Sequence, residues 1–188
     1  MRSQWISATV IFLLAAGAAV AGDPPDNPAI DMAGFLKVAN EAASYRASHR
    51  LNEEEFIRMS AEPGTIVLDA RSAARYAELH VAGAINLSFS DITVDSLRQT
   101  IPDKATRILI YCNNNFRNAE GPFPSKLPTA SLNLSTFIAL YNYGYRNVYE
   151  LGPLLDIHSS RLTFEPPVNR NDAIKTGSEA SRTQAGTP

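Results

Sequence analysis

Four short apolar runs, separated by segments with helical character, constrain the fold of this chain more than any other feature. Turn residues bound the runs, which are Thr65–Leu68, Ala84–Leu87, Arg107–Tyr111 and Asn147–Leu151. Each run is too short for a helix and is mostly aliphatic or β-branched, as expected of strands buried on both faces. The stretches between them predict helices over Ala73–Glu78, Val94–Ile101 and Leu134–Asn142. This alternation predicts an α/β domain whose central sheet is mainly parallel and flanked by helices.

Glycine and capping residues indicate where several helices begin and end. The helix over Leu134–Asn142 is followed by Gly144, a natural C′ glycine. Ahead of the first strand, a helix is expected from Asn52, where Glu55 stands at the third helical position as in a capping box, and it should end before Pro63. An extra N-terminal helix is expected from Asp31, its N-cap, because apolar residues recur after it at helical spacing: Phe35, Val38, Ala42 and Tyr45.

The two ends of the sequence differ from the segment between them. Arg2 is followed by a nearly uninterrupted apolar stretch that ends in Ala19-Val20-Ala21, a form that signal peptidase accepts. Residues 1–21 are therefore interpreted as a signal peptide cleaved after Ala21, which predicts a periplasmic or secreted protein with no membrane attachment. The alternative is an uncleaved anchor, although the run is shorter than the roughly 20 residues that span a bilayer. Residues 22–46 form a lead and the extra helix, 47–165 the main domain, and 166–188 a polar tail expected to be disordered.

Charge and histidine content argue against several classes of partner and cofactor. With 17 basic and 19 acidic side chains the formal net charge is −2, which gives no electrostatic reason to expect nucleic acid or an anionic membrane as partner. One cysteine and three scattered histidines do not suggest a metal site. A glycine-rich phosphate-binding pattern is also missing from the sequence, so no cofactor is expected.

Cys112 is the only cysteine, and it directly follows the apolar run that ends at Tyr111. Ligands of parallel sheets bind beyond the carboxyl ends of the strands, where the amides of the next loop are unpaired. Such amides would favour a thiolate, and Arg117 could grip an anion through two N–H groups. Cys112 is therefore the predicted nucleophile. The expected substrate-binding residues are Asn113, Asn114, Asn115, Phe116 and Arg117.

Each part of this prediction has an alternative. A lone cysteine in an exported chain has no intramolecular partner, so it is either free and reactive, joined to another molecule, or simply a buried inert thiol. The three asparagines either adopt the left-handed backbone that such a loop often needs and bind an anion, or form a plain polar turn.

Several motifs lie in one order along the chain. They are Val67-Leu-Asp-Ala-Arg71, Tyr76, His80-Val-Ala-Gly-Ala-Ile-Asn86, Cys112 with Arg117 five residues later, and Gly144-Tyr-Arg-Asn-Val-Tyr-Glu-Leu151. Over roughly residues 51–155 the chain thereby resembles a single-domain rhodanese (thiosulfate sulfurtransferase-like) module. The resemblance implies a three-layer rhodanese-like fold and a persulfide mechanism. Cys112 would take sulfur from a small anion such as thiosulfate and pass it to an acceptor such as cyanide or a thiol.

The same resemblance assigns roles to other residues. Arg117 would bind the donor anion, and Asp69 and Arg71 would organise the neighbourhood of the site. One departure concerns the segment after Arg117, because Gly144 lies 27 residues further on and Asn118–Thr129 contains three prolines. This insertion is expected to form a lid or wall beside Cys112, and the displaced helix behind it is expected to point its dipole elsewhere.

Two other functions stay open at this point. One is a non-catalytic binding or sensor module with the same fold, whose loop the insertion has remodelled. The other is a phosphatase, since dual-specificity phosphatases have a similar fold. Their loop is Cys-x5-Arg, whereas the spacing from Cys112 to Arg117 is the shorter Cys-x4-Arg.

Overall fold

The computed structural model describes residues 27–165, which fall into two units that meet after Asp31. In the first unit the described residues form a turn, in which the Ile30 amide donates to the Asn27 carbonyl at 2.9 Å. The second unit holds every helix and strand described below. The expected signal peptide and the expected disordered tail lie outside the described residues.

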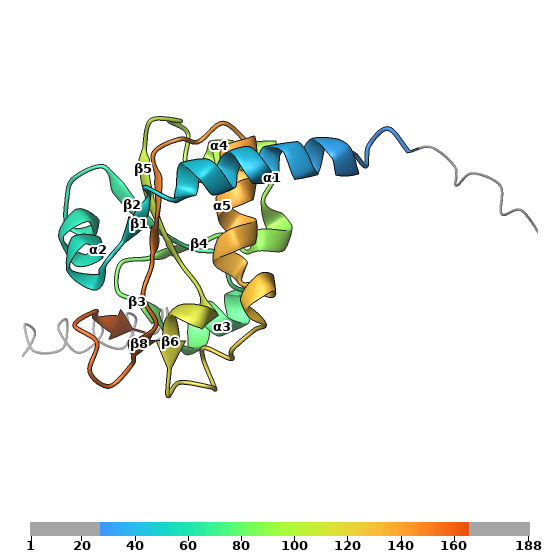
Figure 1. The fold of residues 1–188 in the computed structure, drawn as a ribbon. Coiled ribbons are helices and arrows are strands. Elements are labelled where there is room, and N and C mark those ends of the chain that lie inside the picture. Colours follow the sequence, from blue (N-terminus) through green and yellow to red (C-terminus); the bar gives the residue numbers. More distant parts are fainter. Residues whose placement is uncertain (1–26, 166–188) are drawn as a thin grey trace, which may run out of the picture. The chain divides into compact units, whose positions relative to one another are not determined.

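The central sheet has five parallel strands in the order β1-β7-β5-β2-β4. They are β1 (Arg50–Leu51), β7 (Val148–Leu151), β5 (Arg107–Tyr111), β2 (Thr65–Asp69) and β4 (Ile85–Asn86). The four runs predicted as strands all occur in this sheet, and β5 lies at its centre (Figure 1). Because strand β5 is paired on both sides, its carboxyl end lies between the ends of two neighbouring strands.

Within residues 27–165, five α-helices flank the sheet. They are α1 (Met32–Arg46), α2 (Glu53–Ser60), α3 (Ala73–Glu78), α4 (Val94–Thr100) and α5 (Leu132–Asn142). The predicted capping box of α2 is present, since Asn52 and Glu55 each accept a hydrogen bond from the other's backbone amide. After α5 the chain turns at Gly144, whose φ of 90° is the left-handed conformation expected of a C′ glycine. The expected α/β class and the extra N-terminal helix are confirmed.

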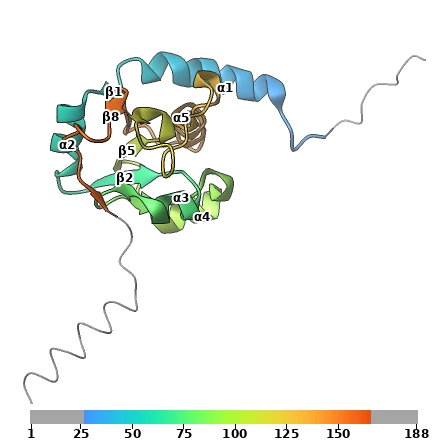
Figure 2. The same cartoon turned by 90° about the horizontal axis from the view of Figure 1, so that it is seen from below.

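Alternating side chains of β5 fill two separate cores. Leu109 and Tyr111 pack on the side of the sheet that α2 covers, and Ile108 and Ile110 pack on the side covered by α1, α4 and α5. Figure 1 shows α2 across the sheet from α5, and both views show α1 lying beside α5 (Figures 1 and 2). Ala42 is the fully buried residue of α1. The N-terminal helix is therefore an integral layer of this domain.

Two short strand pairs lie outside the main sheet. β3 (His80–Val81) pairs antiparallel with β9 (Phe164–Glu165), and β6 (Phe116–Arg117) pairs in parallel with β8 (Leu155–Asp156). Three 3₁₀ turns complete the fold: η1 (Phe89–Asp91), η2 (Asn113–Asn115) and η3 (Pro128–Ala130). The pairing of β6 with β8 matters for function, because it begins four residues after Cys112 and fixes the direction of the chain there.

Within residues 27–165, every helix is too short or too polar to cross a membrane.

Candidate functional site

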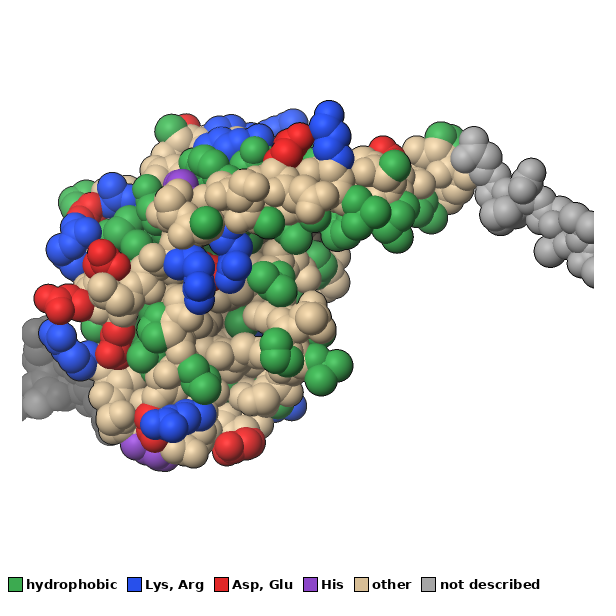
Figure 3. All heavy atoms as spheres, viewed as in Figure 1, with side chains coloured by type: hydrophobic (Ala, Val, Ile, Leu, Met, Phe, Trp, Pro, Cys, Tyr) green, Lys and Arg blue, Asp and Glu red, His purple; other side chains and the backbone are tan. Residues whose placement is uncertain are grey.

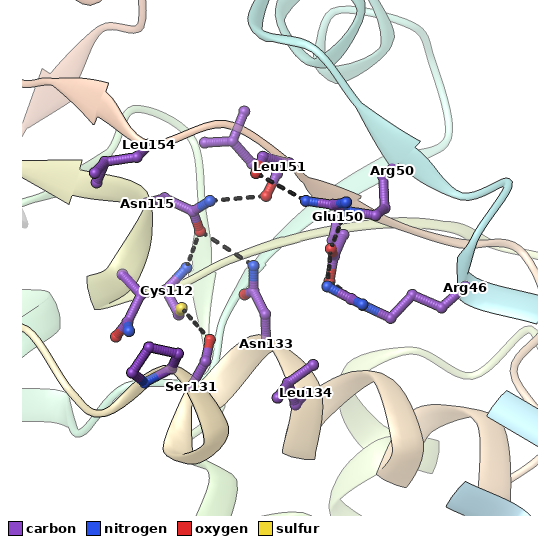
Figure 4. Close-up of a pocket in the computed structure, with 13 residues that line it drawn as sticks. Arg46, Arg50, Cys112, Asn115, Ser131, Asn133, Leu134, Glu150, Leu151 and Leu154 are labelled. Carbon is purple, nitrogen blue, oxygen red and sulfur yellow. Dashed lines mark hydrogen bonds and ion pairs between the residues drawn. The ribbon is translucent and has the colours of Figure 1, made fainter. Parts of the chain in front are cut away.

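Cys112 lies immediately after β5 and lines a cavity of about 360 Å³. Only 1% of the residue is exposed, yet its sulfur faces this cavity rather than a purely aliphatic core (Figure 4). The walls come from four parts of the chain: the end of α1 with β1, the turn after β5, the start of α5, and the end of β7 with the residues after it. The thiol is thus buried at the wall of this cavity.

One side chain lies within hydrogen-bonding distance of the Cys112 sulfur. The Asn115 amide, which follows in the same turn, donates to the Cys112 carbonyl oxygen at 3.1 Å. The Ser131 hydroxyl oxygen lies 3.4 Å from Sγ. In return the Cys112 amide donates to Asn115 Oδ1 at 2.9 Å. Among the described residues the sulfur therefore has one hydroxyl as partner, not the ring of loop amides expected from the sequence.

The start of α5 is also at this site. Ser131 is the N-cap residue of α5 and carries the hydroxyl near Sγ, and Figure 4 shows it at the end of the helix beside Cys112. A helix N-terminus carries a partial positive charge and unpaired amides, both of which favour a nearby anion. The sequence-based expectation that the insertion would turn this helix away from Cys112 was wrong, since the insertion leads the chain back to the sulfur.

The three asparagines after Cys112 form the 3₁₀ turn η2. Asn115 is fully engaged, because its Oδ1 also accepts from Asn133 and its Nδ2 donates to the carbonyls of Leu151 and Pro153. Asn114 pairs with the backbone of Lys126 through both ends of its amide. Among the described non-glycine residues only Asn118 has a positive φ. Asn114 and Asn115 therefore stabilise a polar turn through their side chains and line the cavity. Asn113 does not line it, and its buried Oδ1 has no hydrogen-bond partner among the described residues.

Phe116 and Arg117 do not line the cavity. Phe116 is buried in the core, with its ring 4.6 Å from that of Phe123. The Arg117 side chain is 62% exposed, and its Nε lies 3.6 Å from Asp156 Oδ2. The pairing of β6 with β8 places the two residues on opposite sides of an extended strand, one inward and one toward solvent. The anion-binding position expected for Arg117 is therefore not found beside Cys112.

Asp69 and Arg71 form a buried ion pair that supports the site from outside the cavity. Arg71 Nε lies 3.0 Å from each carboxylate oxygen of Asp69, and Arg71 Nη1 donates to the carbonyl of Pro122 in the insertion at 2.9 Å. The Tyr111 hydroxyl donates to Asp69 Oδ2 at 2.6 Å. Burial, followed by the charge of Asp69 and this hydrogen bond, raises the pKa of Tyr111 far above its ordinary value. The pair thus connects β2, β5 and the insertion.

The insertion after Arg117 is a fixed wall of the site. Phe123 is 1% exposed and its ring lies 4.1 Å from the Arg71 guanidinium carbon. Further along, Pro128 and Ser131 line the cavity. Leu127, which lies between Phe123 and Pro128 in the sequence, is 74% exposed. The structure therefore bears out the expectation of a wall beside Cys112, and anchors it through Phe123.

Arg46, Arg50 and Glu150 line the same cavity and were not predicted as site residues. Arg46 Nε donates to Glu150 Oε2 at 2.8 Å, and Arg50 Nε donates to Glu150 Oε1 at 3.1 Å. The Glu150 side chain is only 1% exposed. The one signal in the sequence was an acid within the apolar strand Val148–Leu151, because a buried carboxylate needs a cationic partner.

The described residues contain no group of three histidine, cysteine or acidic side chains that could hold a metal ion.

Comparison with known proteins identifies the family. The model of the rhodanese-like domain matches residues 52–151, which is more than half of the chain. No curated protein matches the sequence.

Several solved structures are similar in fold. A rhodanese-like domain from Anabaena sp. is 19% identical, with 64% of this chain and 86% of that chain covered and a TM-score of 0.45. A rhodanese from E. coli is 20% identical, with 54% of this chain and 98% of that chain covered and a TM-score of 0.37. A thiosulfate sulfurtransferase from Pseudomonas aeruginosa is 17% identical, with 72% of this chain and 24% of that chain covered and a TM-score of 0.47. On the match of the domain model, the chain belongs to the rhodanese-like domain family.

Proposed function

We propose that this protein is a sulfurtransferase that carries sulfane sulfur as a persulfide on Cys112. The observation that carries the proposal is the position of the Cys112 sulfur, at the carboxyl end of the central strand, in the lining of a cavity and 3.4 Å from the Ser131 hydroxyl at the start of α5. This hydroxyl and the start of α5 favour a negatively charged sulfur. The membership of the rhodanese-like family supports the same reaction class.

The reaction proceeds in two transfers. The Cys112 thiolate attacks the outer sulfur of a donor such as thiosulfate, the sulfur–sulfur bond of the donor breaks, and sulfite leaves with the bonding electron pair. An acceptor such as cyanide or a thiolate then attacks the outer sulfur of the persulfide and releases the Cys112 thiolate. Covalent catalysis of this kind predicts double-displacement kinetics. The Ser131 hydroxyl at the start of α5 would hold the anionic sulfur between the two steps.

Release of thiocyanate from thiosulfate and cyanide tests this proposal. Turnover should exceed the uncatalysed rate and should be abolished in Cys112→Ser, which keeps the size of the side chain but removes the nucleophile. If wild type and variant both give only background release with inorganic and organic sulfane donors alike, the enzyme proposal fails.

A non-catalytic binding or sensor module is the second candidate, and the position of Arg117 favours it. Arg117 faces Asp156 and solvent rather than the cavity, so the site lacks the donor-binding arginine implied by the family pattern. A sensor would bind a sulfur compound at Cys112 without turnover. Stoichiometric modification of Cys112 by a sulfane donor, with no release to any acceptor, would support this second function.

Export to the periplasm or the medium is proposed from the sequence of residues 1–21 alone. Amino-terminal sequencing of the mature protein tests it, because cleavage after Ala21 predicts a chain that begins at Gly22. A chain that keeps Met1 would contradict the signal-peptide interpretation.

A further inference from the structure

We propose that Arg46 and Arg50 form a subsite for the anionic group of an organic sulfur substrate, whose reactive sulfur lies at Cys112. The inference rests on the proposed function, and it names the class of substrate. That class is a thiol or persulfide with a sulfonate, carboxylate or similar group several bonds from the sulfur. It also assigns the recognition to residues that precede the segment matched by the family model, which begins at residue 52.

The charge of this part of the cavity is positive. Two guanidinium groups share the single carboxylate of Glu150, which leaves one positive charge uncompensated. Glu150 is buried, whereas the Arg46 side chain is 26% and that of Arg50 51% exposed. The surplus charge therefore lies on the accessible side of the cluster, and Figure 3 shows a small group of basic side chains beneath α1 on the same face.

Both arginines keep hydrogen-bond donors for a ligand. Arg46 uses Nε and Nη2 on Glu150, and Arg50 uses Nε on Glu150 and Nη2 on the Gly152 carbonyl at 3.2 Å. Among the described residues, the Nη1 group of neither arginine has a hydrogen-bond partner, and both residues line the cavity. A guanidinium offers five N–H donors in a planar fork that matches a carboxylate or sulfonate. The Glu150 carboxylate holds these forks in place.

The rest of the cavity suits an organic body between the two ends. Figure 4 shows Asn115 and Asn133 between Cys112 and the Glu150 cluster, with leucine side chains around them. Leu134, Leu151 and Leu154 contribute apolar surface to the lining. A volume of about 360 Å³ falls in the range of roughly 300–1,000 Å³ typical of sites for small organic molecules. A bare inorganic anion would fill only part of it.

The transfer from such a substrate balances without a further reactant. The Cys112 thiolate attacks the outer sulfur of a persulfide R–S–SH, the bond between the two sulfurs breaks, and R–S⁻ leaves with the electron pair. The proton stays on the transferred sulfur, which becomes the outer atom of the Cys112 persulfide. The anionic group of R binds Arg46 and Arg50 throughout and does not react.

Arg50 is the residue to test. Arg46 contacts the buried Glu150 carboxylate through two nitrogens, so its loss would leave Glu150 poorly paired. The Arg50 side chain is half exposed, and Glu150 keeps its contacts with Arg46 when Arg50 is replaced. The experiment compares wild type, Arg50→Gln, Arg50→Lys and Arg98→Gln. Arg98 is a matched control because it is an exposed arginine on α4 that pairs with Asp95 at the surface, away from the cavity.

The probes are the persulfides of 2-mercaptoethanesulfonate and 2-mercaptoethanol, which have the same carbon chain but differ in charge. The readout is kcat/KM for loading of sulfur onto Cys112, followed by intact mass. Wild type should prefer the sulfonate donor. A charge-assisted hydrogen bond is worth about 1.5–3 kcal/mol, so Arg50→Gln should lower this preference about ten-fold or more through KM. Arg50→Lys should keep part of it, and Arg98→Gln should match wild type.

The possible failures are distinguishable. If both donors load Cys112 and Arg50→Gln leaves their ratio unchanged, the subsite inference is wrong and the sulfurtransferase proposal stands. The subsite inference is equally wrong if Arg50→Gln lowers only thermal stability, since the cluster would then merely fasten α1 and β1 to β7. If neither donor loads Cys112 in any protein, the proposed function itself fails.

Discussion

Replacing Phe123 with alanine would test whether the insertion is a fixed part of the fold. Phe123 is buried to 1% exposure, and its ring lies 4.6 Å from Phe116 and 6.1 Å from Phe164. The Arg71 guanidinium, which also binds the neighbouring Pro122 carbonyl, stacks on the same ring. The substitution therefore removes the one large apolar anchor of the insertion and a cation–π contact together.

The expected loss of stability follows from these contacts. Truncation of a buried phenylalanine costs about 3–5 kcal/mol, and a desolvated cation–π contact contributes about 1–2 kcal/mol. Since part of the space can collapse, we expect a loss of about 4 kcal/mol in the free energy of unfolding. Domains of this size are stable by about 5–15 kcal/mol, so the variant should still fold. With an m-value near 2 kcal/mol/M, the urea midpoint should fall by about 2 M.

Urea denaturation followed by circular dichroism measures this difference. The matched control is Leu127→Ala in the same insertion, where the side chain is 74% exposed and the expected change is below about 0.5 kcal/mol. Phe123→Ala should also slow sulfur loading of Cys112 under native conditions, because the wall that carries Ser131 would be released. A loss of less than about 1 kcal/mol with unchanged loading would show that the insertion is not anchored as described.

Three further predictions concern single side chains. Ser131→Ala removes the hydroxyl 3.4 Å from the Cys112 sulfur and should slow alkylation of the thiol by iodoacetamide at pH 7 several-fold, because a neutral hydrogen bond is worth about 1 kcal/mol. Arg117→Gln should change kcat/KM for thiosulfate less than about two-fold, because its exposed side chain pairs outside the cavity and surface pairs contribute little. In Tyr111→Phe the free energy of unfolding should fall less steeply above pH 10 than in the wild type, by about 1.4 kcal/mol for each pH unit. Urea titrations between pH 9 and 11 measure this difference.

The sign of the last effect follows from the direction of the pKa shift. In the folded state the pKa of Tyr111 is raised, so above pH 10 the unfolded chain loses its phenolic proton while the folded chain keeps it. Stability from this group is fully present below the ordinary pKa and is lost as the pH rises above it. A variant that kept the wild-type slope would contradict the burial of the Tyr111 hydroxyl beside Asp69. Unchanged alkylation in Ser131→Ala, or a large kcat/KM loss in Arg117→Gln, would contradict the described site.

Much of the fold could be predicted because the sequence expresses it locally. Burial on both faces requires unbroken apolar runs, and these marked β2, β4, β5 and β7 within one or two residues. Asn52 with Glu55, and the positive φ of Gly144, mark helix ends through interactions between near neighbours. The strand β1 gave no such signal, because Arg50–Leu51 is not part of an apolar run.

The candidate site was predictable only in part. Cys112 was predicted as the nucleophile because the end of a buried strand is visible in the sequence, and the structure places it in the lining of a cavity. Arg117 was misplaced, because the pairing of β6 with β8 depends on residues about forty positions later in the chain. Arg46 and Arg50 reach the cavity through the parallel register of β1 with β7, which sets Arg50 beside Glu150. Contacts of this range leave no local pattern, apart from the buried acid that requires a partner.

Persulfide chemistry at Cys112 is tested most directly by the intact mass of the protein after incubation with a sulfane donor, followed by removal of excess donor and a second measurement after addition of a thiol acceptor. The proposed mechanism predicts an increase of one sulfur atom, located on Cys112 by peptide mapping, which disappears when the acceptor is added and never forms in Cys112→Ser. A protein that keeps its original mass with thiosulfate and with organic persulfides, or that gains sulfur equally in Cys112→Ser, would contradict it.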